Sequence, residues 1–143
     1  MITTCGSIYR SDDNVNQYSD YYKNHKPSEN CVFCSGDKST IELEDLNLSH
    51  LRVINNSFPY DFWDMKKVED HLMAVPRRHL NCPAKLNAEE LAELNKIMTY
   101  FADKNYDIFV RNSGSKLKSI EHLHFHLIKT KESKLNVKVE YSD

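Results

Sequence analysis

The chain lacks the features that direct a protein to a membrane or to nucleic acid in general. No apolar run in its 143 residues approaches the length needed to cross a bilayer. The formal net charge is −2 and the pI is near 6.4, so the chain as a whole attracts neither nucleic acid nor an anionic membrane. An anionic substrate would therefore need a local cluster of basic groups.

Residues 1–13 lack the apolar segment of a signal peptide. Only four cysteines are present, and Cys31 and Cys34 form a C-x-x-C pair, which without secretion signals indicates metal or redox chemistry before a disulfide framework. We therefore expect an intracellular, cytoplasmic protein. The sequence has no internal repeat, and its length and 40% hydrophobic content predict one domain with its own core.

The apolar pattern predicts an α+β fold. Residues 51–55, 71–75 and 107–111 are typical of core strands, the weaker alternation in 41–48 and 137–139 predicts edge strands, and 61–70 is expected to be a loop. One long helix is predicted over residues 87–104. Because strands and helices do not alternate, we expect an antiparallel sheet of about five strands with this helix packed on one face.

The helix carries recognisable start and burial signals. Asn87 is the expected N-cap, and Glu90 stands at the capping-box position. Apolar side chains then recur at spacings of three and four and predict one buried stripe, made of Leu91, Leu94, Ile97, Met98 and Phe101.

Residues 1–30 are polar and are interpreted as an N-terminal extension of a domain that spans 31–143. Within the extension, Tyr18, Tyr21 and Tyr22 are spaced to form one side of a short helix.

The strongest chemical signal lies in residues 121–128, where His122, His124 and His126 recur at period two with apolar residues between them. A strand points successive side chains to opposite faces, so the three imidazoles should share one face and the apolar residues should enter the core. Imidazole binds metals, attacks phosphorus and transfers protons near neutral pH.

The C-x-x-C pair precedes the turn signal Ser35-Gly36-Asp37, which suits two thiolates on one tetrahedral zinc better than a redox motif at the start of a helix. Such a site needs two further ligands, for which histidine is the natural partner. Two buried thiols without a metal remain the simpler alternative. Arg77 and Arg78 follow a strand and are either a solvated turn or a phosphate-attracting pair.

These motifs together resemble the histidine triad (HIT) family of nucleotide hydrolases and transferases. The family's His-φ-His-φ-His-φ-φ signature, with φ apolar, is matched throughout residues 122–128. Four further elements occur in the family's order: the C-x-x-C of its zinc-bearing branch, Asn56-Ser57-Phe58-Pro59-Tyr60, the segment 71–79 with its Pro-x-x-His end, and Asn112-Ser113-Gly114 followed by Ser119. The resemblance covers residues 31–128 and implies a HIT-like domain over 31–143 and a homodimer.

The resemblance implies a role for each matching residue. His124 would attack the α-phosphorus and form a covalent nucleotidyl-histidine, and His126, Ser119 and Asn112 would donate hydrogen bonds to the phosphate. The nucleotide-binding residues implied are Asn56 at the ribose, His71 near the same pocket and Lys118 beside the leaving group. A structural zinc ion would be held by the four residues that correspond to the zinc-bearing branch, namely Cys31, Cys34, His79 and His122.

The sequence departs from the family pattern in three places. Leu117-Lys118-Ser119 replaces the usual Gly-Gln-Ser, so a neutral donor near the leaving group is exchanged for positive charge. Residues 61–70 replace a short Pro-Gly turn and are expected to reshape or cover the base pocket. The N-terminal extension has no counterpart in the family.

Two other functions fit the same residues. The three histidines of 122–126 are also spaced to bind one metal ion in a metal-dependent enzyme, although no carboxylate ligand stands out. Alternatively, a catalytically weak nucleotide-binding module would keep the fold and the zinc without turnover.

Overall fold

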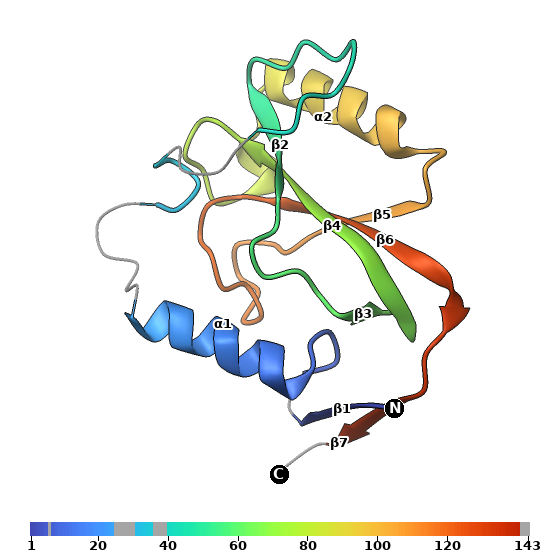
Figure 1. The fold of residues 1–143 in the computed structure, drawn as a ribbon. Helices are drawn as coiled ribbons and strands as arrows, with labels where there is room; N and C mark the ends of the chain where they lie inside the picture. The colour runs from blue at the N-terminus through green and yellow to red at the C-terminus, as the bar shows by residue number, and fades with distance from the viewer. Residues whose placement is uncertain (6, 25–30, 36–39, 141–143) are drawn as a thin grey trace.

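An antiparallel five-stranded sheet forms the centre of the fold, as predicted (Figure 1). The computed structural model describes residues 1–5, 7–24, 31–35 and 40–140. The strands of this sheet are β2 (Leu51–Asn55), β3 (Phe62–Trp63), β4 (Lys66–Pro76), β5 (Tyr106–Val110) and β6 (Phe125–Lys134). Their order is β2-β4-β6-β5, and β3 pairs with the beginning of β4.

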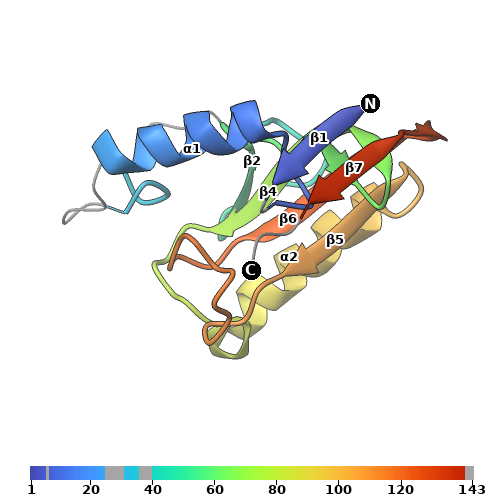
Figure 2. The same ribbon diagram turned by 90° about the horizontal axis from the view of Figure 1, so that it is seen from below.

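Two helices lie on opposite sides of this sheet (Figure 2). They are α1 (Asp12–Asn24) and α2 (Ala88–Phe101), and a short 3-10 helix, Pro83–Lys85, precedes α2. The prediction of one long helix is not confirmed, because α1 has 13 residues and α2 has 14. No helix within the described residues has the length and apolar character needed to cross a membrane.

A second, two-stranded sheet joins the two ends of the described chain. Its strands are β1 (Ile2–Cys5) and β7 (Val137–Glu140), which pair in parallel (Figure 1). A strand over residues 137–139 was therefore predicted correctly, but it pairs with the N-terminus and not with the edge of the main sheet.

The strand register separates an apolar face from a face that carries the histidines. On the face covered by α2, the apolar core combines side chains of the sheet with the helix, including Val53, Ala74, Leu127 and Ile97. On the other face, Met73 of β4 and Phe109 of β5 both pair with His126 of β6. Because side chains alternate along each strand, His71 shares this face with Met73.

The predicted start of α2 is confirmed, whereas its predicted burial is partly wrong. Asn87 and Glu90 form both hydrogen bonds of a capping box. Leu94, Ile97 and Phe101 are buried, but Leu91 and Met98 are 50% and 39% exposed. The buried stripe contains Glu90 and Glu93 instead, because these carboxylates bind groups outside the helix. Glu90 binds Arg78, and Glu93 accepts hydrogen bonds from the backbone N–H groups of residues 49–51.

Two loop and strand predictions are wrong for reasons of backbone conformation. Residues 61–70 are not a loop, because Asp64 and Met65 both adopt positive φ and close a two-residue hairpin between β3 and β4. Residues 41–48 do not form a strand, since Asp45 and Asn47 have positive φ, and only Thr40 makes an isolated bridge, to Ile54.

Candidate active site and metal centre

The three triad histidines are buried on the face of the sheet opposite α2, with exposures of 1% for His122, 7% for His124 and 6% for His126. β6 begins only at Phe125, because the Leu123 N–H donates to the Leu80 carbonyl (2.7 Å) in the connection after β4. The strand predicted over 121–128 is therefore regular only from residue 125. The alternation persists nevertheless, since Leu123, Phe125 and Leu127 all enter the α2-side core.

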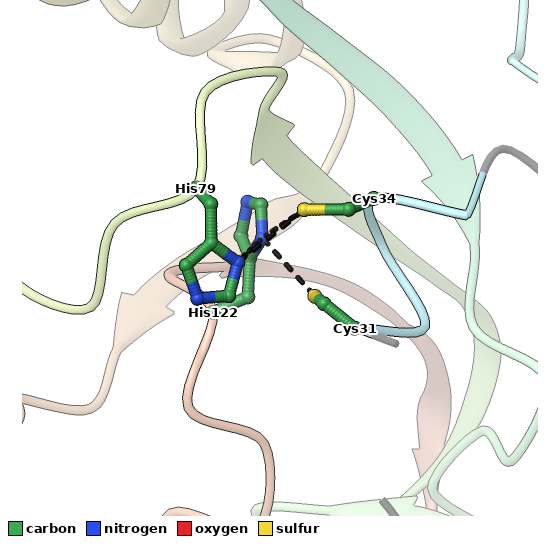
Figure 3. A group of neighbouring side chains, drawn as sticks. All are labelled: Cys31, Cys34, His79 and His122. Atoms are coloured by element: carbon green, nitrogen blue, oxygen red, sulfur yellow. Dashed lines mark hydrogen bonds between the residues drawn. The ribbon is translucent and has the colours of Figure 1, made fainter. Parts of the chain in front are cut away.

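His122 joins His79, Cys31 and Cys34 in a compact cluster (Figure 3). Its Nδ1 lies 3.3 Å from the Cys31 sulfur, 3.4 Å from the Cys34 sulfur and 3.2 Å from His79 Nδ1. His79 Nδ1 lies 3.3 Å from the Cys34 sulfur. Ligands bound tetrahedrally at about 2.0–2.3 Å would be spaced by roughly 3.3–3.8 Å. The cluster, which joins the residues predicted from the sequence, can therefore hold one metal ion.

The protonation of His122 also suits a metal ligand. Its Nε2–H donates to the Pro76 carbonyl (2.8 Å), which leaves Nδ1 without a proton on the side of the thiols. Burial lowers the pKa of His122, so the ring is neutral at physiological pH. Metals bind neutral imidazole, and a hydrogen bond from the other ring nitrogen fixes the ligand's orientation. Two thiols and two imidazoles make a closed set, which would stabilise the structure without presenting an open coordination position.

The loop that carries the two cysteines is anchored beside the triad. The Cys31 carbonyl accepts hydrogen bonds from the N–H groups of Cys34 and Ser35, which closes a turn over residues 31–35. Gly36 and Asp37 of the turn predicted at Ser35-Gly36-Asp37 lie outside the described residues. Between the cysteines, Phe33 is buried and its ring contacts those of His122 and His124 at centroid distances of 5.6 and 5.4 Å. The metal cluster and the central histidine are therefore coupled through packing.

A cavity of about 450 Å³ opens beside His124 and His126. This volume is within the range of small-molecule sites. Ser119, Lys118 and Asn56, all predicted site residues, also line it. His71 lies behind His126, whereas Asn112 is exposed and does not line the cavity.

His124 is held in the tautomer that a nucleophile requires. Its Nδ1 lies 2.8 Å from the His122 carbonyl oxygen, which can only accept, so Nδ1 carries the proton and donates it. Nε2 then has no proton and keeps its lone pair. A neutral imidazole with an unprotonated nitrogen can attack an electrophile such as phosphorus.

A chain of hydrogen bonds sets the opposite tautomer in His126. The Tyr60 N–H donates to His71 Nδ1 (3.0 Å), so the proton of neutral His71 is on Nε2. That proton is donated to His126 Nδ1, 2.9 Å away. His126 consequently carries its own proton on Nε2 and can donate it to a phosphate oxygen. Asn56 Nδ2, 3.3 Å from His71 Nε2, faces another N–H group and forms no hydrogen bond with it.

Both rings of this pair remain neutral over a wide pH range. Burial lowers the pKa of His71 to about 3, assisted by the positive charge of Arg10 and by His124. Burial lowers the pKa of His126 to about 2, with further contributions from His124, His71, Arg111 and Arg10. Near pH 7 the donor that His126 offers is therefore an uncharged imidazole.

Solved structures of histidine triad proteins share this architecture. A HIT family hydrolase from Legionella pneumophila Philadelphia 1 is 15% identical and matches with a TM-score of 0.51, covering 72% of this chain and 95% of that protein. A HIT family hydrolase from Clostridium thermocellum is 19% identical with a TM-score of 0.50, covering 76% and 96%. A histidine triad nucleotide-binding protein from Candida albicans is 18% identical with a TM-score of 0.50, covering 80% and 87%.

The chain has the histidine triad fold. No protein-family model matches the sequence, and no curated protein matches it either. At these identities the likeness establishes the HIT fold alone.

Several residues outside the predicted set also line the cavity of this HIT fold. They come from the N-terminal extension and from the residue that follows β5, and include Tyr9, Arg10, Tyr18, Tyr22 and Arg111. The predicted tyrosine side of a short helix is correct, since the rings of Tyr18, Tyr21 and Tyr22 all contact that of Phe58. No local sequence signal could reveal Arg10, because its position depends on contacts with residues about 50 positions away.

The two arginines considered for phosphate attraction do not line this cavity. Arg78 binds the buried Glu90 carboxylate at 2.7 Å and the Lys85 carbonyl at 2.9 Å, while Arg77 is an exposed residue after β4. Lys118 does line it, and its Nζ donates to the Asn81 carbonyl at 2.7 Å.

Proposed function

We propose that this protein is a nucleotidyl hydrolase or transferase of the histidine triad family. It would act on the α-phosphate of a nucleoside phosphoramidate, a dinucleoside polyphosphate or an adenylylated substrate. The main support for this proposal is the tautomer of His124. The hydrogen bond from its Nδ1–H to the His122 carbonyl leaves Nε2 unprotonated, and the ring lines a cavity large enough for a nucleotide.

In the first step His124 Nε2 forms a bond to the α-phosphorus, and the bond from phosphorus to the leaving group breaks. The leaving group departs with the bonding electrons, and an amine leaving group takes a proton from water. The ring becomes a cationic phosphoryl-imidazole whose Nδ1–H still donates to the His122 carbonyl. Water, or another acceptor in a transferase, then attacks phosphorus and restores neutral His124.

The remaining site residues stabilise the charge that develops on the phosphate. His126 Nε2–H donates to a phosphate oxygen, and His71 keeps that proton in place. Ser119, which lines the cavity, is a further donor. Asn112 is kept as a donor on the family resemblance alone, because its side chain does not line the cavity in this structure. Asn56 binds the ribose hydroxyls through its amide, and Lys118 lies on the leaving-group side.

Zinc is the metal that best suits the cluster of Cys31, Cys34, His79 and His122, because two thiols and two imidazoles are its characteristic structural set. When bound it would supply no reactive group. It would fix the cysteine loop and the segment that precedes His124.

Three further assignments complete the proposal. The polar extension over 1–30 precedes a HIT domain over 31–143, and the protein is cytoplasmic. A homodimer is supported by the exposed Leu91 and Met98 of α2 and by the outer edge of β5, which pairs only with β6 among the described strands.

The geometry favours this proposal over a metal-dependent enzyme with all three triad histidines as ligands. His122 directs Nδ1 toward the cysteines, while His124 Nδ1 donates to a carbonyl and His126 Nδ1 accepts from His71. The three Nδ1 atoms therefore have different partners, and the metal-binding group found among the described residues includes neither His124 nor His126.

The direct test is hydrolysis of adenosine 5′-phosphoramidate and of diadenosine triphosphate by wild type and by His124→Ala. We expect AMP release by the wild type and a loss of at least about 10³-fold in kcat for the variant. Lys96→Ala, an exposed charge change on α2, serves as the control and should retain activity. Equal rates for wild type and His124→Ala would refute the proposal, and AMP binding without turnover by the wild type would favour the binding module.

A further inference from the structure

The cavity beside His124 and His126 has a marked charge imbalance. Its lining contains three cationic side chains, Arg10, Arg111 and Lys118, and no aspartate or glutamate among the described residues. This contrasts with the net charge of −2 for the chain. Cations gathered without acidic partners repel one another, and an anionic ligand relieves that repulsion.

Arg10 is positioned at this cavity by a segment that is hydrogen-bonded to the sheet. The Tyr9 carbonyl accepts hydrogen bonds from the N–H groups of Asp61 and Phe62, at 2.9 and 3.3 Å. The Asp61 carboxylate in turn accepts from the Ser11 N–H at 2.6 Å and from Asn14 Nδ2 at 2.5 Å. The residues on both sides of Arg10 are therefore tied to the hairpin that begins with β3.

The guanidinium of Arg10 lies between two aromatic rings. Its central carbon is 4.6 Å from the ring centroids of both Tyr18 and Tyr60, and Nη2 donates to the Phe58 carbonyl at 2.9 Å. Nε is buried and finds no hydrogen-bond acceptor among the described residues. A buried N–H of a cation without an acceptor is costly, so the described residues do not fully compensate the positive charge of Arg10, and an anion in the cavity would stabilise it.

The same group of rings connects both arginines to the triad. Tyr60 stacks on His126 at 5.8 Å, and Phe109 stacks on the same imidazole at 4.4 Å. Arg111 lies over Phe109 at 5.6 Å. Burial is the main cause of the lowered pKa of His126, and the positive charges of Arg111 and Arg10 contribute to it. An anion bound by these arginines would lie next to a phosphate held at His126.

We propose that Arg10, together with Arg111, binds negatively charged groups of the substrate beyond the α-phosphate. The site would thereby select substrates with an anionic leaving group over those with a neutral one. This inference rests on the proposed nucleotidyl hydrolase function. It makes the N-terminal segment a part of the active site, because Arg10 contacts the substrate directly. A planar guanidinium can bind two phosphate oxygens at once, which a lysine cannot.

Binding of AMP, ADP and ATP, which differ only in phosphate number, tests this inference without turnover. The His124→Ala protein is titrated with each nucleotide by calorimetry at constant ionic strength, alone and combined with Arg10→Met or Arg10→Lys. We expect ATP to bind at least about tenfold more tightly than AMP, and Arg10→Met to remove most of that ratio while changing AMP affinity less than about threefold. Arg10→Lys should fall between, because it keeps the charge but loses the planar group.

A kinetic comparison in the otherwise wild-type protein gives an independent measure. Arg10→Met should lower kcat/KM for diadenosine triphosphate by about 10- to 100-fold and for adenosine 5′-phosphoramidate by less than about threefold. Lys96→Ala is the matched charge control. An unchanged ratio of ATP to AMP affinity in Arg10→Met, or an equal loss for both substrates, would overturn the inference.

The two proposals fail in different ways. If His124→Ala retains wild-type turnover, the proposed nucleophile is wrong, whereas the nucleotide series still reports whether Arg10 binds additional phosphates. If turnover requires His124 but Arg10→Met leaves the affinity ratio unchanged, only the inference about Arg10 is wrong. Circular dichroism of each variant establishes whether it is folded. If Arg10→Met does not fold, the same affinity ratio is measured with Arg10→Lys.

Discussion

Replacing His71 with phenylalanine should slow the reaction without removing any group that contacts the substrate. His71 is 3% exposed and links the Tyr60 N–H to His126 Nδ1 through hydrogen bonds of 3.0 and 2.9 Å. Phenylalanine fills the space but can neither accept from Tyr60 nor donate to His126. His126 could then carry its proton on either ring nitrogen, and a fraction of the molecules would have no Nε2–H to donate.

The size of the effect follows from those two hydrogen bonds. Each buried polar group left without a partner costs about 1–3 kcal/mol, so His71→Phe should lower the free energy of unfolding by about 2–4 kcal/mol after partial compensation by apolar burial. A partner that only orients a reacting group typically contributes about 10- to 100-fold, so we expect kcat/KM to fall by that factor. His71→Gln retains an amide N–H donor directed to His126 and should recover much of the activity.

The assay combines kinetics with a direct observation of the tautomer. Nitrogen-15 NMR of the imidazole rings distinguishes protonated from unprotonated nitrogens, and wild-type His126 should have its proton on Nε2. His71→Phe should show a mixture of tautomers, and His71→Gln should restore the wild-type state. A His71→Phe protein with wild-type kcat/KM and an unchanged His126 tautomer would refute the reasoning.

Three further predictions concern metal, pH and the N-terminal segment. Cys31→Ala should abolish binding of one zinc equivalent and lower Tm by at least about 10 °C, whereas His124→Ala should retain the metal, as measured by elemental analysis and calorimetry. In the folded state the pKa of His71 is about 3 and that of His126 about 2, below the ordinary value of 6.5. Between pH 6.5 and about 3 the unfolded chain therefore protonates both rings, whereas the folded protein keeps them neutral. The free energy of unfolding should therefore fall by roughly 2–3 kcal/mol per pH unit from pH 6 towards pH 3, measured by urea denaturation, and His71→Gln should reduce that slope. Asp61→Ala removes the acceptor for the start of α1 and should speed amide hydrogen exchange in α1 but not in α2.

The fold was predictable where a local signal determined the structure. Short, mostly apolar runs identified residues 51–55 and 71–75 as strands, and the Asn87 to Glu90 spacing identified the capping box of α2. The hairpin at Asp64 and Met65 was missed because it lacks the glycine or asparagine that normally reveals positive φ. The buried positions of α2 were partly misjudged because charged groups elsewhere determine the burial of its glutamates.

Part of the candidate site could likewise be predicted from the sequence, and part could not. The metal cluster and the row of histidines were predicted from spacing and family resemblance, and the structure brings Cys31, Cys34, His79 and His122 together. Arg10 was missed, because it reaches the cavity only through pairing of Tyr9 with the start of β3. Contacts between an extension without periodic pattern and a distant hairpin leave no signature in the sequence.

Detection of the covalent intermediate tests the central claim most directly. Wild-type protein is mixed with adenosine 5′-phosphoramidate, quenched within the first turnover under conditions that preserve phosphoramidates, and mapped by peptide mass spectrometry. The account predicts an adenylyl group on His124 that forms and decays with the turnover rate, and no adduct in His124→Ala. An adduct on another residue, or rapid AMP release by wild type without any adduct, would contradict it.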